Sequence, residues 1–337
     1  ERLFHGAYPV VDYKGLVFAY FGPPERKPAF PKLDMMDLPG NEMVPWQIHS
    51  PCNWLQVSEN SMDPYHTPFL HTRMSGVQFE EAWGELPVVD YHEREFGFFY
   101  TNARRSADNI WVRVHDHLLP NFSQNGALYE KGEVVRYFGR SSLTRWVVPI
   151  DDTSTFVIAW RNLNTMDDPE GRSRRDQIGW ESVDFYGQNA DRPFSQRQSN
   201  PGDWDAWVSQ GPINSHQRET LGGTDQGVRL LRNALRKGVR NLQQGIEPLV
   251  PDAQDQAFVS TFAGDTILRV PKGSGDDRAL ILQTSKRIAD VYIKFQYLPD
   301  EQRRAAIARD LRCRCVPAEN RLDRRAVAGH DHVDVPV

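Results

Sequence analysis

The chain has 337 residues, of which 39% are hydrophobic and 25% are charged, as is ordinary for a globular protein of one large or two modest domains. A net charge of −5, without a basic run interleaved with aromatic residues, argues against nucleic-acid binding. No apolar stretch approaches the roughly 20 residues of a transmembrane helix, so a membrane partner is not expected.

The cysteines are Cys52, Cys313 and Cys315. They are too few for a disulfide framework, and a cytoplasmic location is therefore predicted.

The first 50 residues predict a small β structure followed by a connector. Residues 7–11 and 16–21 alternate like strands, and the turn-forming residues 12–15 join them as a hairpin. Residues 23–42 are rich in proline and predict an extended linker, and residues 43–50 predict a strand.

Residues 53–71, NWLQVSENSMDPYHTPFLH, carry the pattern Asp63, His66, His71. Pro64 suits the first turn of a new helix, so we expect a helix that is broken near residues 61–64. Two imidazoles five residues apart can hold a divalent metal from one side. A carboxylate from elsewhere would complete a 2-His-1-carboxylate triad with open positions, which suits Fe(II) that reacts with dioxygen.

The rest of the chain predicts a long antiparallel sheet followed by helices. Strands are expected at residues 82–92, 96–102, 111–118, 133–138, 143–148 and 155–162. Residues 164–201 predict a long polar loop. Residues 224–243 predict a helix with Thr224 as N-cap, its apolar stripe on the sheet and its arginines on a solvated face. A short helix is expected at residues 300–311, and His92, His115 and His117 are interpreted as ordinary strand residues.

Residues 53–71 closely resemble the iron-binding segment of the Rieske-type non-haem iron aromatic ring-hydroxylating oxygenases, in the alpha (oxygenase) subunit of the phthalate dioxygenase-like branch. The resemblance extends from about residue 8 to residue 243. It implies an α+β fold: a helix-grip (START/Bet v 1-like) catalytic domain with a curved antiparallel sheet and a long C-terminal helix, plus a remnant of an all-β Rieske domain. The expected division is 1–35 for the remnant and linker, 36–320 for the catalytic mononuclear iron domain, and 321–337 for a tail.

The resemblance also implies roles for single residues. In the family, an aspartate ligand stands eight residues before the glycine of a Gly-Pro-Ile, which here indicates Asp203, with Asp205 as the alternative. Asp184 and Glu181 are weaker alternatives. The resemblance makes Asp63 an electron-transfer bridge beside a ligand histidine. Asn53 and Glu59 are expected to line or support the site.

The family's 2Fe–2S Rieske cluster requires Cys-x-His and Cys-x-x-His, and neither pattern occurs in this chain. We therefore expect the cluster-bearing part of the full-length protein to lie upstream of Glu1. The implied activity is Fe(II)- and O2-dependent ring hydroxylation, or O- or N-demethylation, of an aromatic substrate in an apolar tunnel. Electrons are expected from NAD(P)H through a reductase, with or without a ferredoxin, in a homotrimer.

Two other functions fit parts of the same pattern. A helix-grip protein that binds hydrophobic ligands without redox activity would need no Rieske cysteines. A zinc hydrolase could use the same three ligands with a bound water. Neither explains Asp63 together with the two histidines.

Overall fold

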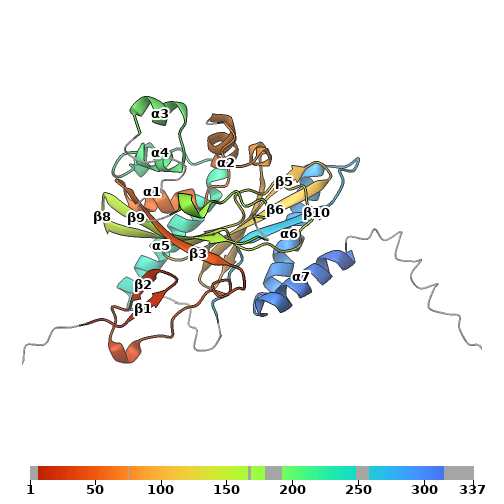
Figure 1. The fold of residues 1–337 in the computed structure, drawn as a ribbon. Helices are drawn as coiled ribbons and strands as arrows, with labels where there is room; N and C mark the ends of the chain where they lie inside the picture. The colour runs from red at the N-terminus through yellow and green to blue at the C-terminus, as the bar shows by residue number, and fades with distance from the viewer. Residues whose placement is uncertain (1–6, 75, 166–167, 179–191, 248–257, 315–337) are drawn as a thin grey trace, which may run out of the picture.

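The computed structural model describes residues 7–74, 76–165, 168–178, 192–247 and 258–314. An eight-stranded antiparallel sheet lies at its centre (Figure 1). Seven strands follow one another across the sheet: β3 (Glu42–Ser50), β9 (Ser154–Leu163), β8 (Leu143–Asp151), β7 (Phe122–Asn125), β6 (Asn109–Leu118), β5 (Gly97–Ser106) and β4 (Val88–Arg94). The eighth, β10 (Gly264–Arg269), pairs with β6. The mixed α and β class with an antiparallel sheet is thus confirmed.

Side chains that alternate along β5 and β6 divide the molecule into layers, because successive residues of a strand point to opposite faces. On one face, Phe99 and Val112 belong to a core with Ile288 of α6 (Asp277–Lys294) and Ile307 of α7 (Asp300–Arg314). On the opposite face, Phe98 and Tyr100 pack with Leu231 of α5 (Gln226–Gln243). The helices that follow lie on this second face.

The second face carries α1 (Trp54–Asn60), α2 (His66–Pro68), a π-helical segment (Phe69–Met74), α4 (Asp203–Val208) and α5 (Gln226–Gln243). Trp204 and Trp207 of α4 are 2% exposed and pack with Trp46 and Val147 of the sheet. Their indole N–H groups donate to the carbonyl of His49 and to Ser50 Oγ. This fixes the N-terminus of α4 beside the sheet.

The predicted N-terminal hairpin is present as β1 (Val10–Tyr13) and β2 (Leu16–Ala19). Phe18 packs against Trp146 and Trp160, and the Trp160 indole donates to the carbonyl of Lys14. Short helical turns connect the larger elements: η1 (Pro24–Arg26), η3 (Glu81–Gly84), η4 (Arg175–Gln177), α3 (Phe194–Ser199), η5 (His216–Arg218) and η6 (Gly223–Asp225).

Two predicted strands need correction. Residues 133–138 do not form a strand, and of them only Arg136 makes an isolated bridge, to Ile267 of β10. The strand predicted at 82–92 begins at Val88, because residues 81–84 form a 3-10 turn. Strands β7 and β10 and helix α6 were not predicted.

The helix predicted at 224–243 is present, but its surroundings differ from the prediction. It begins at Gln226 after a 3-10 turn, so Thr224 is not its N-cap. Val239 and Leu242 are 55% and 57% exposed, so the last turns of the apolar stripe do not pack on the sheet. Arg232 is buried and forms ion pairs with Glu59 and Glu219.

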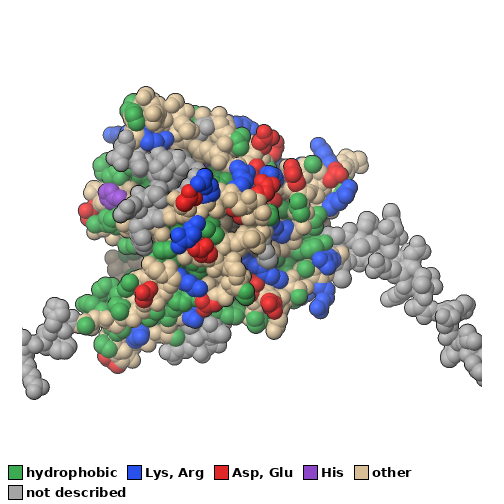
Figure 2. All heavy atoms as spheres, viewed as in Figure 1, with side chains coloured by type: hydrophobic (Ala, Val, Ile, Leu, Met, Phe, Trp, Pro, Cys, Tyr) green, Lys and Arg blue, Asp and Glu red, His purple; other side chains and the backbone are tan. Residues whose placement is uncertain are grey.

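None of the helices in the described ranges has the length and apolarity that spanning a bilayer demands. On the face shown in Figure 2, acidic and basic side chains are interspersed rather than gathered by sign. Hydrophobic side chains are more frequent at the lower left, where Figure 1 places the β1–β2 hairpin and where Val10, Val17 and Phe21 are exposed.

Candidate metal centre

The helical segment that carries the histidines is broken where the sequence predicted. Asn53 caps α1 by accepting the N–H of Leu55 at 3.0 Å, and α1 ends at Asn60. After a short irregular stretch, His66 begins α2, and His71 lies in the π-helical segment. The break and the wider π turn let both imidazoles face the same point.

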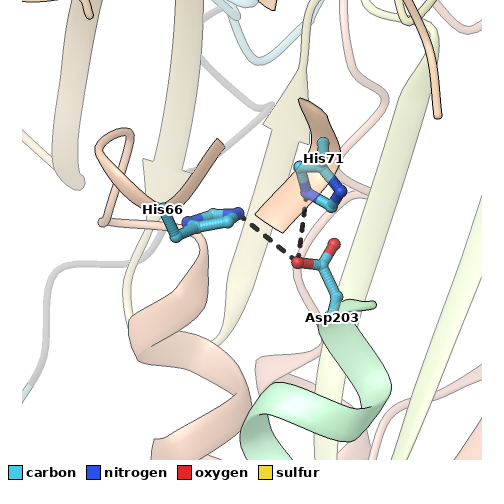
Figure 3. A group of neighbouring side chains, drawn as sticks. All are labelled: His66, His71 and Asp203. Atoms are coloured by element: carbon cyan, nitrogen blue, oxygen red, sulfur yellow. Dashed lines mark ion pairs between the residues drawn. The ribbon is translucent and has the colours of Figure 1, made fainter. Parts of the chain in front are cut away.

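The third residue of the centre lies far from the two histidines in the sequence. Asp203 is the first residue of α4, and its carboxylate points between the two imidazoles (Figure 3). Its Oδ1 lies 3.4 Å from His66 Nε2 and 3.3 Å from His71 Nε2. In the described part of the chain, these three residues are the one group of His, Cys, Asp or Glu whose ligand atoms converge, all within 4.8 Å.

The alternative, Asp205, does not face the imidazoles. Its carboxylate pairs with Arg192 and accepts the backbone N–H of Gly202 at 3.1 Å, across the start of α4. Residues 203–208 form a helix, in which residues two apart point in different directions, so Asp203 and Asp205 do not face the same way. Asp184 and Glu181 lie outside the described residues.

Hydrogen bonds orient the three side chains. His71 Nδ1 lies 2.8 Å from Gln78 Oε1, an acceptor, so Nδ1 carries a proton and Nε2 is the nitrogen that faces Asp203. The Gln78 amide donates to the carbonyl of Pro201 at 3.1 Å, which connects the His71 segment to the chain leading into α4. Asn60 donates to Asp203 Oδ1 at 3.1 Å.

Asp63 stands on the far side of His66. Its Oδ2 is 3.5 Å from His66 Nδ1, while its Oδ1 accepts the backbone N–H of Tyr65 at 2.9 Å. One carboxylate thus both orders the turn and faces the imidazole edge that points away from Asp203. Its side chain is 30% exposed, more than those of the three converging residues.

The charges of the centre depend on each other. Burial opposes protonation of His66, but the carboxylates of Asp203 and Asp63 outweigh it and raise the pKa of His66 to about 10. Burial alone would raise the pKa of Asp203, but the imidazoles of His71 and His66 hold that pKa well below its usual value. These charges favour a proton on His66 between the two carboxylates, and a divalent cation bound at the centre would take the place of that proton.

The donor set fits a metal ion. Bond lengths of about 2.1 Å at one face of an ion place neighbouring donors about 3 Å apart. The two His–Asp distances are already close to that spacing. Two neutral nitrogens and one carboxylate on one side leave coordination positions open for small molecules, as in Fe(II) oxygenase sites.

The pocket beside the triad is not the apolar tunnel that we expected. Phe79 and Trp83 do form an aromatic wall, with ring centroids 5.0 and 5.9 Å from that of His71. The sheet wall, however, carries Arg113, His115 and Arg145. The cavity is therefore mixed in character, and its charged and aromatic groups meet where the Arg113 guanidinium lies 4.2 Å from the centre of the Trp83 ring.

Two predicted site residues lie away from the pocket. Asn53 caps α1 and donates to the carbonyl of Asp152 at 2.8 Å, and Glu59 forms an ion pair with Arg232. Both support the segment that carries the histidines without lining the cavity. Asn60 and Gln78 were not predicted as site residues, although Asn60 lies in residues 53–71, three positions before Asp63.

No protein-family model matches the chain. It is 35% identical over 333 residues to the tert-butanol monooxygenase / tert-amyl alcohol desaturase oxygenase subunit of Aquincola tertiaricarbonis, covering 92% of this chain and 70% of that protein. It is 31% identical over 288 residues to phenoxybenzoate dioxygenase subunit alpha of Ectopseudomonas oleovorans, covering 79% and 63%. Among solved structures, dicamba monooxygenase bound to 3,6-dichlorosalicylic acid matches with a TM-score of 0.46 and 15% identity, covering 70% of this chain and 71% of that one.

Proposed function

Since the chain belongs to the Rieske-type non-haem iron oxygenases, as their oxygenase subunit, we propose that His66, His71 and Asp203 hold its mononuclear Fe(II). The observation that carries the proposal is the convergence of two imidazole nitrogens and one carboxylate oxygen from segments over 130 residues apart. Bound there, Fe(II) would supply the activation of O2 for hydroxylation of a substrate, or for its O- or N-demethylation.

The chain's own residues prepare this centre. Gln78 sets the tautomer of His71, and Asn60 holds the carboxylate of Asp203. Phe79 and Trp83 cover one side of His71 and exclude water there. Asp63 faces His66 from a partly exposed position. This position suits a carboxylate on the electron path from a neighbouring subunit to His66 and the metal centre.

The finer points of the family assignment also belong to this proposal. We expect a homotrimer that receives electrons from NAD(P)H through a reductase, with or without a ferredoxin, and through a 2Fe–2S Rieske cluster that this chain's residues do not ligate. Substrate binding is expected in the helix-grip domain predicted at residues 36–320, with residues 1–35 as the end of a Rieske domain. The tail predicted at 321–337 lies outside the described residues. A cytoplasmic location is supported by the cysteine count.

The alternative, a carrier of hydrophobic ligands, is not supported. The relatives are oxygenase subunits. A carrier also has no need for two imidazoles and a carboxylate that converge beside a charged wall.

Metal exchange tests the proposal. Chelated protein, supplied with the redox partners and NAD(P)H, should consume O2 in a substrate-dependent way after Fe(II) is added back, and not after Zn(II). Failure of Fe(II) to restore O2 uptake, together with a hydrolytic activity that returns with Zn(II), would support the hydrolase instead.

A variant of Asp63 separates iron binding from electron delivery. Asp63→Asn should keep its iron and lose most NAD(P)H-driven turnover. The amide carries no negative charge and cannot replace the carboxylate as the link between His66 and the neighbouring subunit. Wild-type turnover in this variant would remove Asp63 from the electron path.

A further inference from the structure

Residues 78–80 carry two of the contacts that surround His71. Gln78 Oε1 lies 2.8 Å from His71 Nδ1, and the backbone N–H of Gln78 donates to the His71 carbonyl at 3.0 Å. The centroid of the Phe79 ring lies 5.0 Å from that of the imidazole. Residues 76–80 belong to no helix or strand, so no backbone ladder of their own fixes them. Their position depends on contacts with other parts of the chain.

A single arginine from the polar loop supplies three such contacts. Arg172 Nη2 donates to the Phe79 carbonyl at 3.2 Å, and its Nη1 forms an ion pair with Glu80. Its guanidinium carbon lies 4.4 Å from the centre of the Tyr129 ring. A planar guanidinium can donate at its edge and stack by its face at the same time, which a lysine cannot do. Arg172 thus connects the backbone at residue 79, the side chain at residue 80 and a ring beside them.

The turn that carries Arg172 is itself fastened to the sheet. The carboxylate of Asp168 accepts the backbone N–H of Arg172 at 3.0 Å and that of Ser173 at 2.6 Å. Arg161 of β9, which is 8% exposed, donates to Ser173 Oγ at 2.7 Å. The guanidinium of Arg172 is therefore presented to residues 79 and 80 from a central strand of the fold.

Loss of this guanidinium would reach His71 through the chain. The side chain of Glu80 is 12% exposed, and without Arg172 its carboxylate would lose the cation that it pairs with. A mostly buried carboxylate without a partner is costly, so the chain would move it toward water. Glu80 stands only two residues from Gln78, and such a movement draws Gln78 away from the imidazole.

We infer that Arg172 is a positioning residue of the metal centre, which holds residues 78–80 against His71. This rests on the proposed function, because it assigns the loop residue a role in binding Fe(II) at the triad. The Gln78 amide also donates to the carbonyl of Pro201 at 3.1 Å, so Arg172 is the second of two anchors of this stretch. The polar loop predicted at residues 164–201 thereby gains a function, which is to support the metal centre from outside the pocket.

The test measures the affinity for Fe(II) by competition with a chelator of known affinity. Arg172→Gln should bind Fe(II) about 10-fold more weakly than the wild type, at the lower end of the loss expected for partners of a ligand histidine, because Pro201 still holds Gln78. Arg172→Lys should lose less, since the ammonium keeps the ion pair with Glu80 but not the planar fork. Arg174→Gln, the same change at an exposed residue of the same segment, should bind like the wild type.

A double variant shows whether Arg172 acts through Gln78. Gln78→Leu combined with Arg172→Gln should bind Fe(II) no more weakly than Gln78→Leu alone, because residues that act along one path do not add their effects. Losses that multiply would overturn the inference, as would wild-type affinity in Arg172→Gln or an equal loss in Arg174→Gln. If Arg172→Gln does not fold, the same comparisons made with Arg172→Lys decide the question.

A second readout needs no iron. In the proton NMR spectrum of the metal-free protein, the Nδ1–H of His71 should exchange slowly with water, and its signal is assigned by its loss in His71→Ala. Arg172→Gln should make this proton exchange faster, and an unchanged exchange rate would overturn the inference. Failure of the proposed function looks different: the wild-type protein would take up no iron, while the effect of Arg172→Gln on this proton could still be measured.

Discussion

One hydrogen bond determines which nitrogen of His71 faces Asp203. Gln78 Oε1 can only accept, and the Gln78 amide is already used on Pro201, so the proton of His71 lies on Nδ1. Nε2 is then the nitrogen that can bind a cation. Gln78 also connects the two segments that bring the donors together.

Gln78→Leu removes this acceptor while keeping a side chain of similar size. We expect the affinity for Fe(II) to fall by roughly 10- to 100-fold, as is usual when the partner of a ligand histidine is lost. Competition with a chelator of known affinity measures the change. Gln244→Leu, at the exposed end of α5, is the matched control, and an equal loss of affinity in both variants would contradict the role given to Gln78.

His117 is buried without charge. Burial, with Arg145 nearby, lowers its pKa from 6.5 to about 4, and its Nδ1 lies 3.1 Å from Ser61 Oγ. Because the unfolded chain binds the proton at higher pH than the folded chain, this group costs no stability above about pH 6.5. As the pH falls from there toward 4, the unfolded chain takes up the proton and the free energy of unfolding falls progressively.

The wild-type free energy of unfolding should therefore fall more steeply than that of His117→Gln in this window, by up to about 1.4 kcal/mol per pH unit. Urea unfolding at a series of pH values measures both curves. His49→Gln, at an exposed position, should keep the wild-type slope. Parallel curves for wild type and His117→Gln would show that His117 does not have the lowered pKa.

The sequence predicted the residues whose pattern is local, and missed those whose role depends on tertiary packing. His66 and His71 are close in the chain, and Asp203 stands at a fixed distance from the Gly-Pro-Ile of residues 211–213. Gln78 had no such pattern, because its importance comes from its contact with Pro201, far away in sequence. Glu59 was expected to line or support the site, and its ion pair with Arg232 makes it a support of the histidine-bearing segment that does not line the pocket.

At the scale of elements, the position of the histidines depends on how closely α5 approaches the break between α1 and α2. Gly227, in the first turn of α5, makes this approach possible. A Cβ at this position would meet the carbonyl oxygen of Met62 and would lie 2.7 Å from the Tyr91 ring. The Tyr91 hydroxyl itself donates to the Met62 carbonyl at 3.1 Å.

Gly227→Ala should destabilise the protein by about 1–3 kcal/mol, because a methyl group there forces the two segments apart. Gly238→Ala is the matched change in the same helix, and nothing lies within 4 Å of its Cβ position. It should stabilise by up to about 1 kcal/mol through helix propensity alone. Chemical unfolding of both variants measures the difference, and effects of the same sign would contradict this packing.

The elements that the sequence predicted are those with a clear period or a clear break. The N-terminal hairpin, the long strands and the broken helix are of this kind. Strand β7 has one apolar residue, Phe122, and the apolar residues Ile267 and Leu268 of β10 are adjacent rather than alternating, so neither strand shows the expected pattern. Residues 133–138 alternate like a strand, but only Arg136 of this stretch finds a bridge partner, in β10.

For the whole molecule, the sheet separates a structural side from a chemical side. Helices α6 and α7 cover one face with an apolar core. The other face holds the converging side chains, the aromatic wall and the buried Arg113 and Arg145. Stability and chemistry can therefore be changed separately, and a substitution near α6 or on the edge strand β4 is a fair control for one at the centre.

The central claim is that His66, His71 and Asp203 bind iron, and the metal content of the protein tests it most directly. Anaerobic protein titrated with Fe(II), desalted and analysed by mass spectrometry should retain about one iron per chain. His71→Ala and Asp203→Ala should retain almost none while keeping the wild-type circular dichroism spectrum, and His92→Ala, on the edge strand β4, should bind iron like the wild type. Folded wild-type protein that retains no iron, or variants that bind as much as the wild type, would contradict the account.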